Sequence, residues 1–376
     1  HRAELAERWR AHHLVVTSYD LLRRDEALYE GQEFYACILD EAQAIKNHTT
    51  QKYKAVCKVR SRVRFALTGT PVENRLGELW SIFSFLMPGY LPPYKSFCSR
   101  FEKPIVQEED QTAVRRLNQL TGPFILRRMK SDVLKELPPK TENVYRIELE
   151  EEQRKLYLAA VVDAREKLQA AKPEDKMAVF AVLMRLREIC CDPRLIADNW
   201  EGGSAKLDAC AELVSSAVEG GHRILLFSQF TSMLELLAKR LDAEGISHFT
   251  LQGSTPKPVR AELVRRFNGG EVSVFLISLR AGGTGLNLTA ADIVIHYDPW
   301  WNVAAQNQAT DRAYRIGQQN PVQVYKLIAQ DTIEEKIVEL QQAKQSLADT
   351  VTGTADGAIL SMRPDELLQL LEGSEP

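Results

Sequence analysis

Short runs of wholly apolar residues, separated by helix-like stretches, most strongly constrain what this chain can fold into. The clearest are RILLFS at 223–228 and VFLIS at 274–278. Neither run alternates apolar with polar residues, which indicates strands buried on both faces of a parallel sheet. Helix-like text follows at 231–244 and 259–267. This alternation predicts doubly wound α/β layers.

The same criteria divide the chain into four parts. The runs predicted as strands are 14–17, 35–39, 64–67, 144–149, 223–227, 272–277, 293–297 and 322–327. Residues with a helical pattern dominate the middle of the chain, so we expect a helical insertion at 76–200 between two α/β pieces, at 1–75 and 201–350. The last part, at 351–376, is expected to be a flexible tail that holds one short amphipathic helix. The EGGSAK segment is the expected hinge.

Composition excludes several protein classes. Lys plus Arg is 48 and Asp plus Glu is 51, and the net charge of −3 excludes a wholesale basic binder but not a local basic face. No apolar run approaches the roughly 20 residues that span a bilayer, so no membrane partner is expected. The six cysteines include no C-x-x-C pair, which favours buried thiols in a reducing cytoplasm over a zinc site.

Two carboxylates, Asp40 and Glu41, directly follow the apolar run YACIL. In open α/β sheets, ligands bind beyond the carboxyl ends of the strands. Asp40 can hold Mg²⁺ there through water, and Glu41 can deprotonate an attacking water. The alternative for this pair alone is that Asp40 caps the next helix.

Two glycine-bearing turns follow other apolar runs. In the first, Thr68 and Thr70 flank a glycine, where their hydroxyls can face a nucleotide or a phosphate backbone. In the second, Gly283 and Gly285 allow backbone amides to approach a phosphate closely. The alternative for both is an ordinary turn.

The QNQATDRAYRIGQ segment predicts one helix face that carries Gln308, Asp311, Arg312 and Arg315. Two arginines, oriented by Gln308 and Asp311, suit the charge that develops on a transferring phosphoryl group. The alternative is a solvated face on which Asp311 pairs with Arg315.

Other features indicate a nucleic-acid surface. Trp301 follows Trp300 in a loop, which indicates either core or an interface facing bases or sugars. Basic residues crowd the segment between Ala42 and Val72, which has no acidic residue: Lys46, Lys52, Lys54, Lys58, Arg60, Arg62 and Arg64. A weaker basic group follows: Arg115, Arg116, Arg127, Arg128 and Lys130. Such groups favour phosphate contacts without base specificity, and a solvated face is the alternative for the lysines.

Taken together, these strings closely resemble the Swi/Snf-type family of superfamily-two helicase-like ATPases. DEAQ is similar to its Walker B box, LTGTPVENRLGELW to motif III and LFSQFTSMLELL to motif IV. AGGTGLNLTAAD with YDPWWN, and QATDRAYRIGQ, are similar to motifs V and VI. ILRRMKSDVLKELPPK resembles the segment after the first lobe. The resemblance covers about residues 12–347.

The resemblance implies two RecA-like parallel-sheet lobes, the first truncated at its N-terminus, with helical protrusions between them. It assigns Asp40 to Mg²⁺, Glu41 to the hydrolytic water, and Arg312 and Arg315 to the γ-phosphate of ATP. Gln308 would help to position those arginines. Further residues implied to bind the nucleotide are Gly283, Gly285 and Asp311. Residues implied to face the DNA backbone are Thr17, Thr68, Thr70, Ser228, Gln229, Gly253, Thr284 and Trp301, of which Thr68 and Thr70 would also couple hydrolysis to lobe movement.

The implied activity is ATP-dependent movement along double-stranded DNA, which would displace or remodel bound proteins such as RNA polymerase. Two alternatives stay open: a non-catalytic scaffold that binds nucleic acid or polymerase, and a helicase that separates strands. The D-E-A-Q spelling suggests a prokaryotic member, hence a cytoplasmic, nucleoid-associated protein.

The sequence departs from the family pattern in two places. No G-x-x-x-x-G-K-[ST] occurs in the 376 residues, and in the family this phosphate-binding loop lies far upstream of the Walker B box. We therefore expect His1 to lie within the first lobe and the chain to be inactive alone. Val303 stands where the family commonly has proline, and we expect little consequence.

Overall fold

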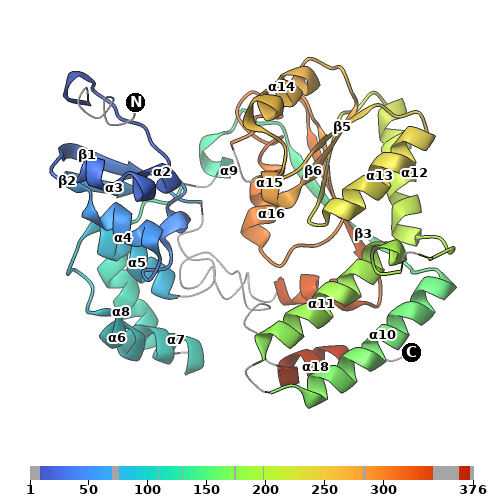
Figure 1. Cartoon of the computed structure of the whole chain (residues 1–376), viewed down its shortest axis with the longest axis horizontal. Helices are drawn as coiled ribbons and strands as arrows, with labels where there is room; N and C mark the ends of the chain where they lie inside the picture. The colour runs from blue at the N-terminus through green and yellow to red at the C-terminus, as the bar shows by residue number, and fades with distance from the viewer. Residues whose placement is uncertain are drawn as a thin grey trace. The chain divides into compact units, whose positions relative to one another are not determined.

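The computed structural model describes residues 9–69, 76–108, 110–128, 130–172, 175–197, 199–282, 285–341 and 364–372. They form two compact units, the first ending at Arg127 and the second beginning at Arg128 (Figure 1). The boundary falls inside the stretch predicted as one helical insertion at 76–200. That stretch is therefore shared between the units: its helix at 76–86 contacts the strand at 60–66, whereas its residues 140–147 form a strand of the other sheet.

The first unit centres on two parallel strands, β1 (Glu33–Leu39) and β2 (Arg60–Ala66). Its α-helices are α2 (Tyr19–Arg24), α3 (Glu26–Tyr29), α4 (Gln51–Lys58), α5 (Leu76–Leu86), α6 (Tyr94–Phe97), α7 (Lys103–Gln107) and α8 (Gln111–Thr121). Three short 3-10 helices complete the described part of this unit: η1 (Trp9–Ala11), η2 (Ala42–Ile45) and η4 (Gly122–Phe124). A π-helix, η3 (Cys98–Glu102), lies between α6 and α7. Ser18 and Thr50 cap α2 and α4, each accepting a backbone N–H. Fully buried residues such as Ile45, Val56 and Phe85 form the core beneath the strands.

The prediction of a strand at 14–17 is wrong. The structure has no strand there, and Leu14 and Val16 are 76% and 84% exposed. A strand needs a hydrogen-bonded neighbour, and among the described residues β1 and β2 pair only with each other.

The second unit is built on a six-stranded parallel sheet in the order β3-β8-β7-β4-β6-β5. Its strands are β3 (Lys140–Ile147), β4 (Ile224–Ser228), β5 (His248–Leu251), β6 (Val274–Ser278), β7 (Ile293–His296) and β8 (Val322–Ala329). All but β5 correspond to predicted runs; β5 escapes prediction because its four residues include His and Thr. The parallel α/β arrangement confirms the predicted fold class.

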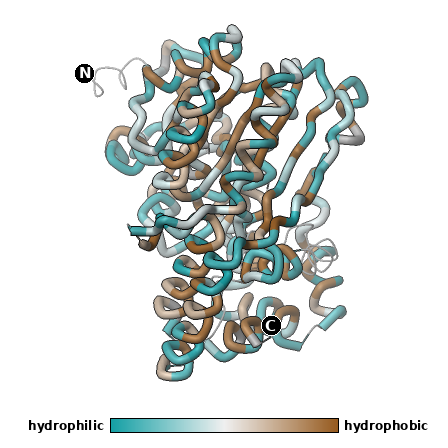
Figure 2. The backbone as a smooth tube through the Cα atoms, turned by 90° about the vertical axis from the view of Figure 1, so that its right-hand side faces the viewer, coloured by the Kyte–Doolittle hydropathy of each residue, from teal (hydrophilic) through white to brown (hydrophobic). Residues whose placement is uncertain are grey.

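Helices cover both faces of this sheet, as the unbroken apolar strands predicted. The helices of the second unit are α9 (Lys130–Val133), α10 (Glu151–Ala170), α11 (Lys176–Cys191), η5 (Pro193–Leu195), α12 (Ala205–Glu219), α13 (Thr231–Ala243), α14 (Lys257–Asn268), α15 (Leu279–Gly282), α16 (Val303–Thr310), a helical segment at 333–341 and α18 (Pro364–Glu372). Leu226 and Leu276 pack with α12 and α13, whereas their neighbours Leu225 and Phe275 pack on the opposite face. Figure 2 shows that the helices carry both hydrophobic and hydrophilic positions, as expected of covering layers.

A separate helical layer consists of α10, α11 and α18 (Figure 1). Leu367 and Leu371 of α18 are fully buried against it, together with Ile333 and Ile337. Helix α18 is the short amphipathic helix predicted within the tail at 351–376, and its apolar stripe docks on α10 and α11. None of the described helices has both the length and the apolar character needed to cross a bilayer.

Candidate functional site

Asp40 and Glu41 lie at the carboxyl end of β1, as predicted. Asp40 is exposed, its Oδ1 accepts the Glu41 N–H at 3.0 Å, and its carbonyl accepts the Tyr19 hydroxyl at 2.7 Å. Burial, helped by the negative charge of Asp40, raises the pKa of Tyr19 to about 12. This phenol therefore stays protonated and keeps donating to the turn. The hydrogen bond from Tyr19 therefore fixes the backbone from which the Asp40 and Glu41 side chains extend.

Glu41 has a left-handed backbone, with φ 50° and ψ 52°. Such a conformation costs a non-glycine residue on the order of 1 kcal/mol. The turn is held because the Leu67 N–H donates to the Leu39 carbonyl at 2.7 Å and the Ala42 N–H donates to the Leu67 carbonyl at 2.9 Å. These bonds bring the ends of β1 and β2 together and aim the Glu41 side chain back toward η2.

Gln43 joins the two predicted motifs of the first unit. Its Nε2 donates to Glu41 Oε2 at 2.6 Å, and its Oε1 accepts the Thr68 hydroxyl at 2.8 Å. One amide therefore connects the carboxylate after β1 to the hydroxyl after β2. The sequence did not single out Gln43, although its place as the last letter of DEAQ was an available signal.

The chemistry of this edge fits a hydrated Mg²⁺ and a phosphate. Asp40 presents hard carboxylate oxygens toward solvent, which Mg²⁺ binds while retaining several waters. Within the described residues, no group of three His, Cys, Asp or Glu side chains forms a protein-only metal cage.

The arginine segment differs from its prediction. Helix α16 ends at Thr310, and 311–317 continue as turns. Gln308, Asp311, Arg312 and Arg315 therefore do not share one helical face. The side chain of Arg312 is buried, with 6% of the residue exposed, whereas Arg315 is exposed. The Arg312 carbonyl accepts the Leu288 N–H at 3.0 Å. The helix ends because the Arg312 N–H bonds the Ala309 carbonyl, three residues back, and Gly317 follows at φ 102°.

Asp311 pairs with a residue that the sequence placed in a weak basic group. Lys130 Nζ lies 2.6 Å from Asp311 Oδ1 and 3.2 Å from the Tyr314 carbonyl. Both side chains of the pair are 41% exposed, so it stabilises the unit by no more than about 1 kcal/mol. Its effect is to link α9 to the turn between Arg312 and Arg315.

The parallel sheet of the second unit gathers other predicted residues at the carboxyl ends of its strands. Gln229 follows β4, but both polar atoms of its side-chain amide are buried without a hydrogen-bond partner among the described residues. Gly253 follows β5 in an exposed turn, and its carbonyl accepts Arg260 Nη2 at 2.8 Å. Thr231 and Ser232, at the start of α13, expose hydroxyls beside Gln229. No pattern in the sequence singled out these two hydroxyls, because they stand at the start of an otherwise apolar helix.

Two predicted DNA contacts, Ser228 and Trp301, are instead buried. The Ser228 hydroxyl is fully buried and donates to Asp298 Oδ1 at 2.6 Å. Trp301 is 4% exposed and packs beside Phe180 of α11, with ring centroids 5.9 Å apart. Of the two interpretations of the loop tryptophan, the core one holds, because the helical layer covers its ring.

The remaining predicted residues fall into two groups. Thr17 is exposed before α2, and Gly285 has a φ of 24° with open space around its α-carbon. Thr70, Gly283 and Thr284 lie outside the described residues.

The basic segment beside the DEAQ box is largely engaged within its own unit. Lys52 lies 3.1 Å from Asp20, Lys46 lies 3.8 Å from Glu78, and Lys58 pairs with Glu26. Arg64 donates to the carbonyls of Phe85 and Val59. The interpretation of this whole segment as a phosphate-facing surface is therefore not supported, because acidic residues elsewhere in the unit neutralise several of its charges.

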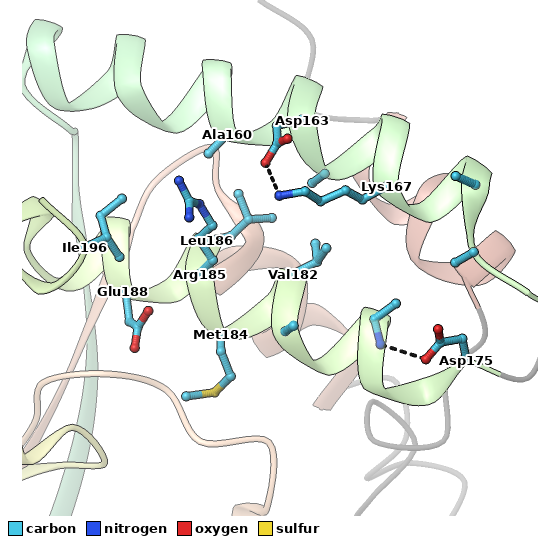
Figure 3. A pocket seen from close by; sticks show the side chains of 15 residues that line it. Ala160, Asp163, Lys167, Asp175, Val182, Met184, Arg185, Leu186, Glu188 and Ile196 are labelled. Carbon is cyan, nitrogen blue, oxygen red and sulfur yellow. Dashed lines mark hydrogen bonds and ion pairs between the residues drawn. The ribbon is translucent and has the colours of Figure 1, made fainter.

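A groove of about 700 Å³ lies between α10 and α11 (Figure 3). Alanines such as Ala160 and Ala178 line much of it, and the Asp163–Lys167 ion pair, 2.7 Å long, lies at its edge. None of the predicted nucleotide or DNA residues lines this groove. It is therefore not the candidate site.

Comparison with protein-family models gives two matches. The model described as the SNF2-related domain matches residues 2–195, and the helicase conserved C-terminal domain matches residues 205–317. The first match alone covers more than half of the chain.

Individual relatives agree with these matches. An uncharacterized ATP-dependent helicase of Mycoplasma pneumoniae is 39% identical over 99% of this chain. A Bacillus subtilis protein, provisionally named an ATP-dependent helicase/translocase, is 40% identical over 95% of it. The chain spans only 36% and 40% of the lengths of these two relatives. The Sulfolobus solfataricus SWI2/SNF2 ATPase core, solved in complex with double-stranded DNA, superposes with a TM-score of 0.54 at 34% identity, over 94% of this chain and 76% of that one.

Proposed function

We propose a function for this chain on the premise that it belongs to the SNF2-related ATPases with a helicase C-terminal domain. It is the Walker B and arginine-bearing part of an ATP-dependent double-stranded DNA translocase that remodels or displaces proteins bound to DNA. The observation that carries this proposal is the hydrogen-bonded chain Glu41–Gln43–Thr68 at the carboxyl ends of β1 and β2.

Each part of this edge suits one task in ATP hydrolysis. Glu41 takes the proton of the attacking water, and its hydrogen bond from Gln43 fixes the direction of its carboxylate. Asp40 would hold a hydrated Mg²⁺, and that ion would supply positive charge beside the phosphates of ATP. Gln308 and Asp311 flank the arginine segment, from which Arg312 and Arg315 supply positive charge to the transition state.

Thr68 provides the step from hydrolysis to movement. Its hydroxyl donates a hydrogen bond to the Gln43 amide, and that amide donates a hydrogen bond to the Glu41 carboxylate, so a movement of either partner moves the other. A change at the γ-phosphate therefore reaches the end of β2, next to Gly69 and Thr70, through two hydrogen bonds. Within the second unit, Gly285 has open space around it, which would let a phosphate approach its backbone closely.

The DNA-binding surface of the second unit lies at the carboxyl ends of its strands, with the exposed residues Gly253 and Thr231 as contacts to phosphates. In the first unit Thr17 serves the same purpose. The solved SWI2/SNF2 core in complex with double-stranded DNA supports this choice of partner. Backbone contacts of this kind do not read sequence.

Duplex binding by this chain tests the proposal. We expect duplexes of unrelated sequence to bind with Kd values within about threefold of each other and with an affinity that falls linearly in log–log plots against salt. Fluorescence anisotropy of two labelled duplexes at several salt concentrations measures both. Binding to one sequence only, or no binding at low salt, contradicts the proposal.

A further inference from the structure

We propose that Arg187 is a positioning residue for the DNA-binding edge of the second unit. Through Asp298 it fixes the segment 228–231 against the loop 298–302. The inference rests on the proposed function, because it concerns the segments there assigned to duplex binding.

Arg187, on α11, is fully buried although it carries a charge. Its Nη2 lies 3.3 Å from Asp298 Oδ2 and donates to the Pro299 carbonyl. The guanidinium carbon lies 4.5 Å from the centroid of the Trp301 ring, a cation–π distance. One arginine therefore contacts the start, the second residue and the fourth residue of a single loop.

Asp298 gathers donors from a second loop. Its Oδ1 accepts the Ser228 hydroxyl at 2.6 Å and the Gln229 N–H at 3.2 Å. The Ser228 oxygen in turn accepts the Phe230 N–H at 3.1 Å. Since Asp298 is fully buried, its carboxylate replaces lost hydration with these donors and with Arg187. The conformation of 228–230 thus depends on a carboxylate that Arg187 holds.

The geometry of the sheet explains why this matters for a ligand. β4 and β7 are neighbours, with Phe227 opposite His296, so the two loops leave the sheet side by side at its carboxyl edge. Immediately beyond Ser228 come Gln229 and the exposed hydroxyls of Thr231 and Ser232. Any shift of Asp298 would move these groups together.

A buried ion pair is a poor source of stability, because desolvation cancels most of its attraction. A well-packed apolar residue at position 187 would give the folded unit at least the same stability. The directional contacts of Arg187 instead define one arrangement of two loops, a role that a purely structural core residue does not require.

Duplex binding by variants of this chain tests the inference. Arg187→Met is expected to raise the Kd for a labelled duplex about tenfold, and Arg187→Lys, which keeps the charge, about threefold. The matched control is Lys206→Met, which breaks another fully buried ion pair of the same unit, with Glu334. It is expected to keep the Kd within about twofold of the wild type. Circular dichroism establishes that each variant is folded.

The salt dependence separates positioning from a general loss of structure. Because Arg187 is buried and neutralises no phosphate, plots of log Kd against log salt for its variants should run parallel to the wild type. If Arg187→Met does not fold, the Kd of the Asp298→Asn variant tests the inference instead, and Glu334→Gln is its isosteric control. Asp298→Asn is expected to weaken binding about fivefold and Glu334→Gln less than twofold.

Two results would overturn the inference. One is wild-type affinity in folded Arg187→Lys and Asp298→Asn; the other is equal weakening in the Lys206→Met and Glu334→Gln controls. A wild-type chain that binds no duplex instead contradicts the proposed function itself, so the two failures are distinguishable.

Discussion

Glu41 keeps a backbone conformation that few non-glycine residues adopt, and its neighbours explain why. Two backbone hydrogen bonds across the ends of β1 and β2 determine the turn, and Gln43 then holds the carboxylate. Strain at such a position persists only where the surroundings over-determine it. At the scale of one residue, the candidate site therefore depends on Gln43 as much as on the two acids before it.

Replacing Gln43 tests this dependence. In a form of the protein that includes a phosphate-binding loop, Gln43→Ala is expected to lower kcat for ATP hydrolysis about 10- to 100-fold and to leave the KM for ATP nearly unchanged. The reason is that Glu41 and Thr68 lose their common partner. Steady-state kinetics measure both constants. Gln51→Ala, an exposed glutamine of the same unit, is the control; equal kcat values in the two variants would contradict the role of Gln43.

His296 is a second residue whose surroundings set its chemistry. It is fully buried, stacks on Phe227 and lies 2.8 Å from the Thr310 hydroxyl. Burial, with a smaller effect of the Lys326 charge, lowers its pKa from 6.5 to about 3. The imidazole therefore stays neutral at the end of α16, just before the arginine segment.

The lowered pKa of His296 predicts how stability changes with pH. Between about pH 3 and 6.5 the unfolded chain binds a proton here that the folded chain does not, so acid favours unfolding. We expect this residue to remove about 1 kcal/mol of unfolding free energy between pH 7 and pH 5.5. Urea unfolding at both pH values measures it. His296→Gln should flatten the difference by that amount; an unchanged pH dependence would refute the prediction.

At the scale of elements, the all-parallel sheet determines where functional groups can meet. Its strands end at one edge, which gathers Gln229, Gly253 and the loop after β7. The arginine segment begins beside this edge, since the Thr310 hydroxyl lies 2.8 Å from His296 at the carboxyl end of β7. The chain then runs toward the start of β8, where Gln318 Nε2 donates to the Ala291 carbonyl at 2.7 Å, close to the start of β7.

Helix α18 provides a test at the same scale. Leu371→Ala is expected to destabilise the docked helix by about 2 kcal/mol, because a fully buried leucine leaves a cavity against α10. Hydrogen exchange of the α10 and α11 amides should accelerate, because α18 undocks more often and each undocking also breaks the 2.8 Å hydrogen bond from Arg165 to the carbonyl of residue 371. Gln369→Ala, on the exposed face of α18, should change neither quantity. Equal exchange in the two variants would mean that α18 does not stabilise the layer.

At the scale of the whole molecule, the 376 residues hold the Asp40–Glu41 pair and the arginines Arg312 and Arg315 but no G-x-x-x-x-G-K-[ST] loop. Since that loop binds the β- and γ-phosphates, we predict no DNA-stimulated ATP hydrolysis by this chain alone. A coupled phosphate-release assay with and without duplex measures it. DNA-stimulated turnover that disappears in Glu41→Gln would contradict the prediction, because the variant excludes a contaminating ATPase.

Much of the architecture could be predicted from local patterns. Fully apolar runs located most of the strands, since burial on both faces leaves no polar alternation. The carboxylates after β1 were placed correctly because a parallel sheet puts its functional residues at strand ends. The helix at 306–318 was predicted too long, because its arginine spacing is helical while hydrogen bonds to 286–291 turn the chain after Thr310.

The sequence by itself determined most of the elements, their order and the chemical groups that they carry, because propensity and periodicity act between near neighbours. Only the tertiary structure decided which of those groups a ligand can reach. Ser228 and Trp301 are buried because residues far along the chain cover them, and Arg187 meets Asp298 across 111 positions of sequence. Burial and pairing are properties of packed surfaces, which no local pattern of residues specifies.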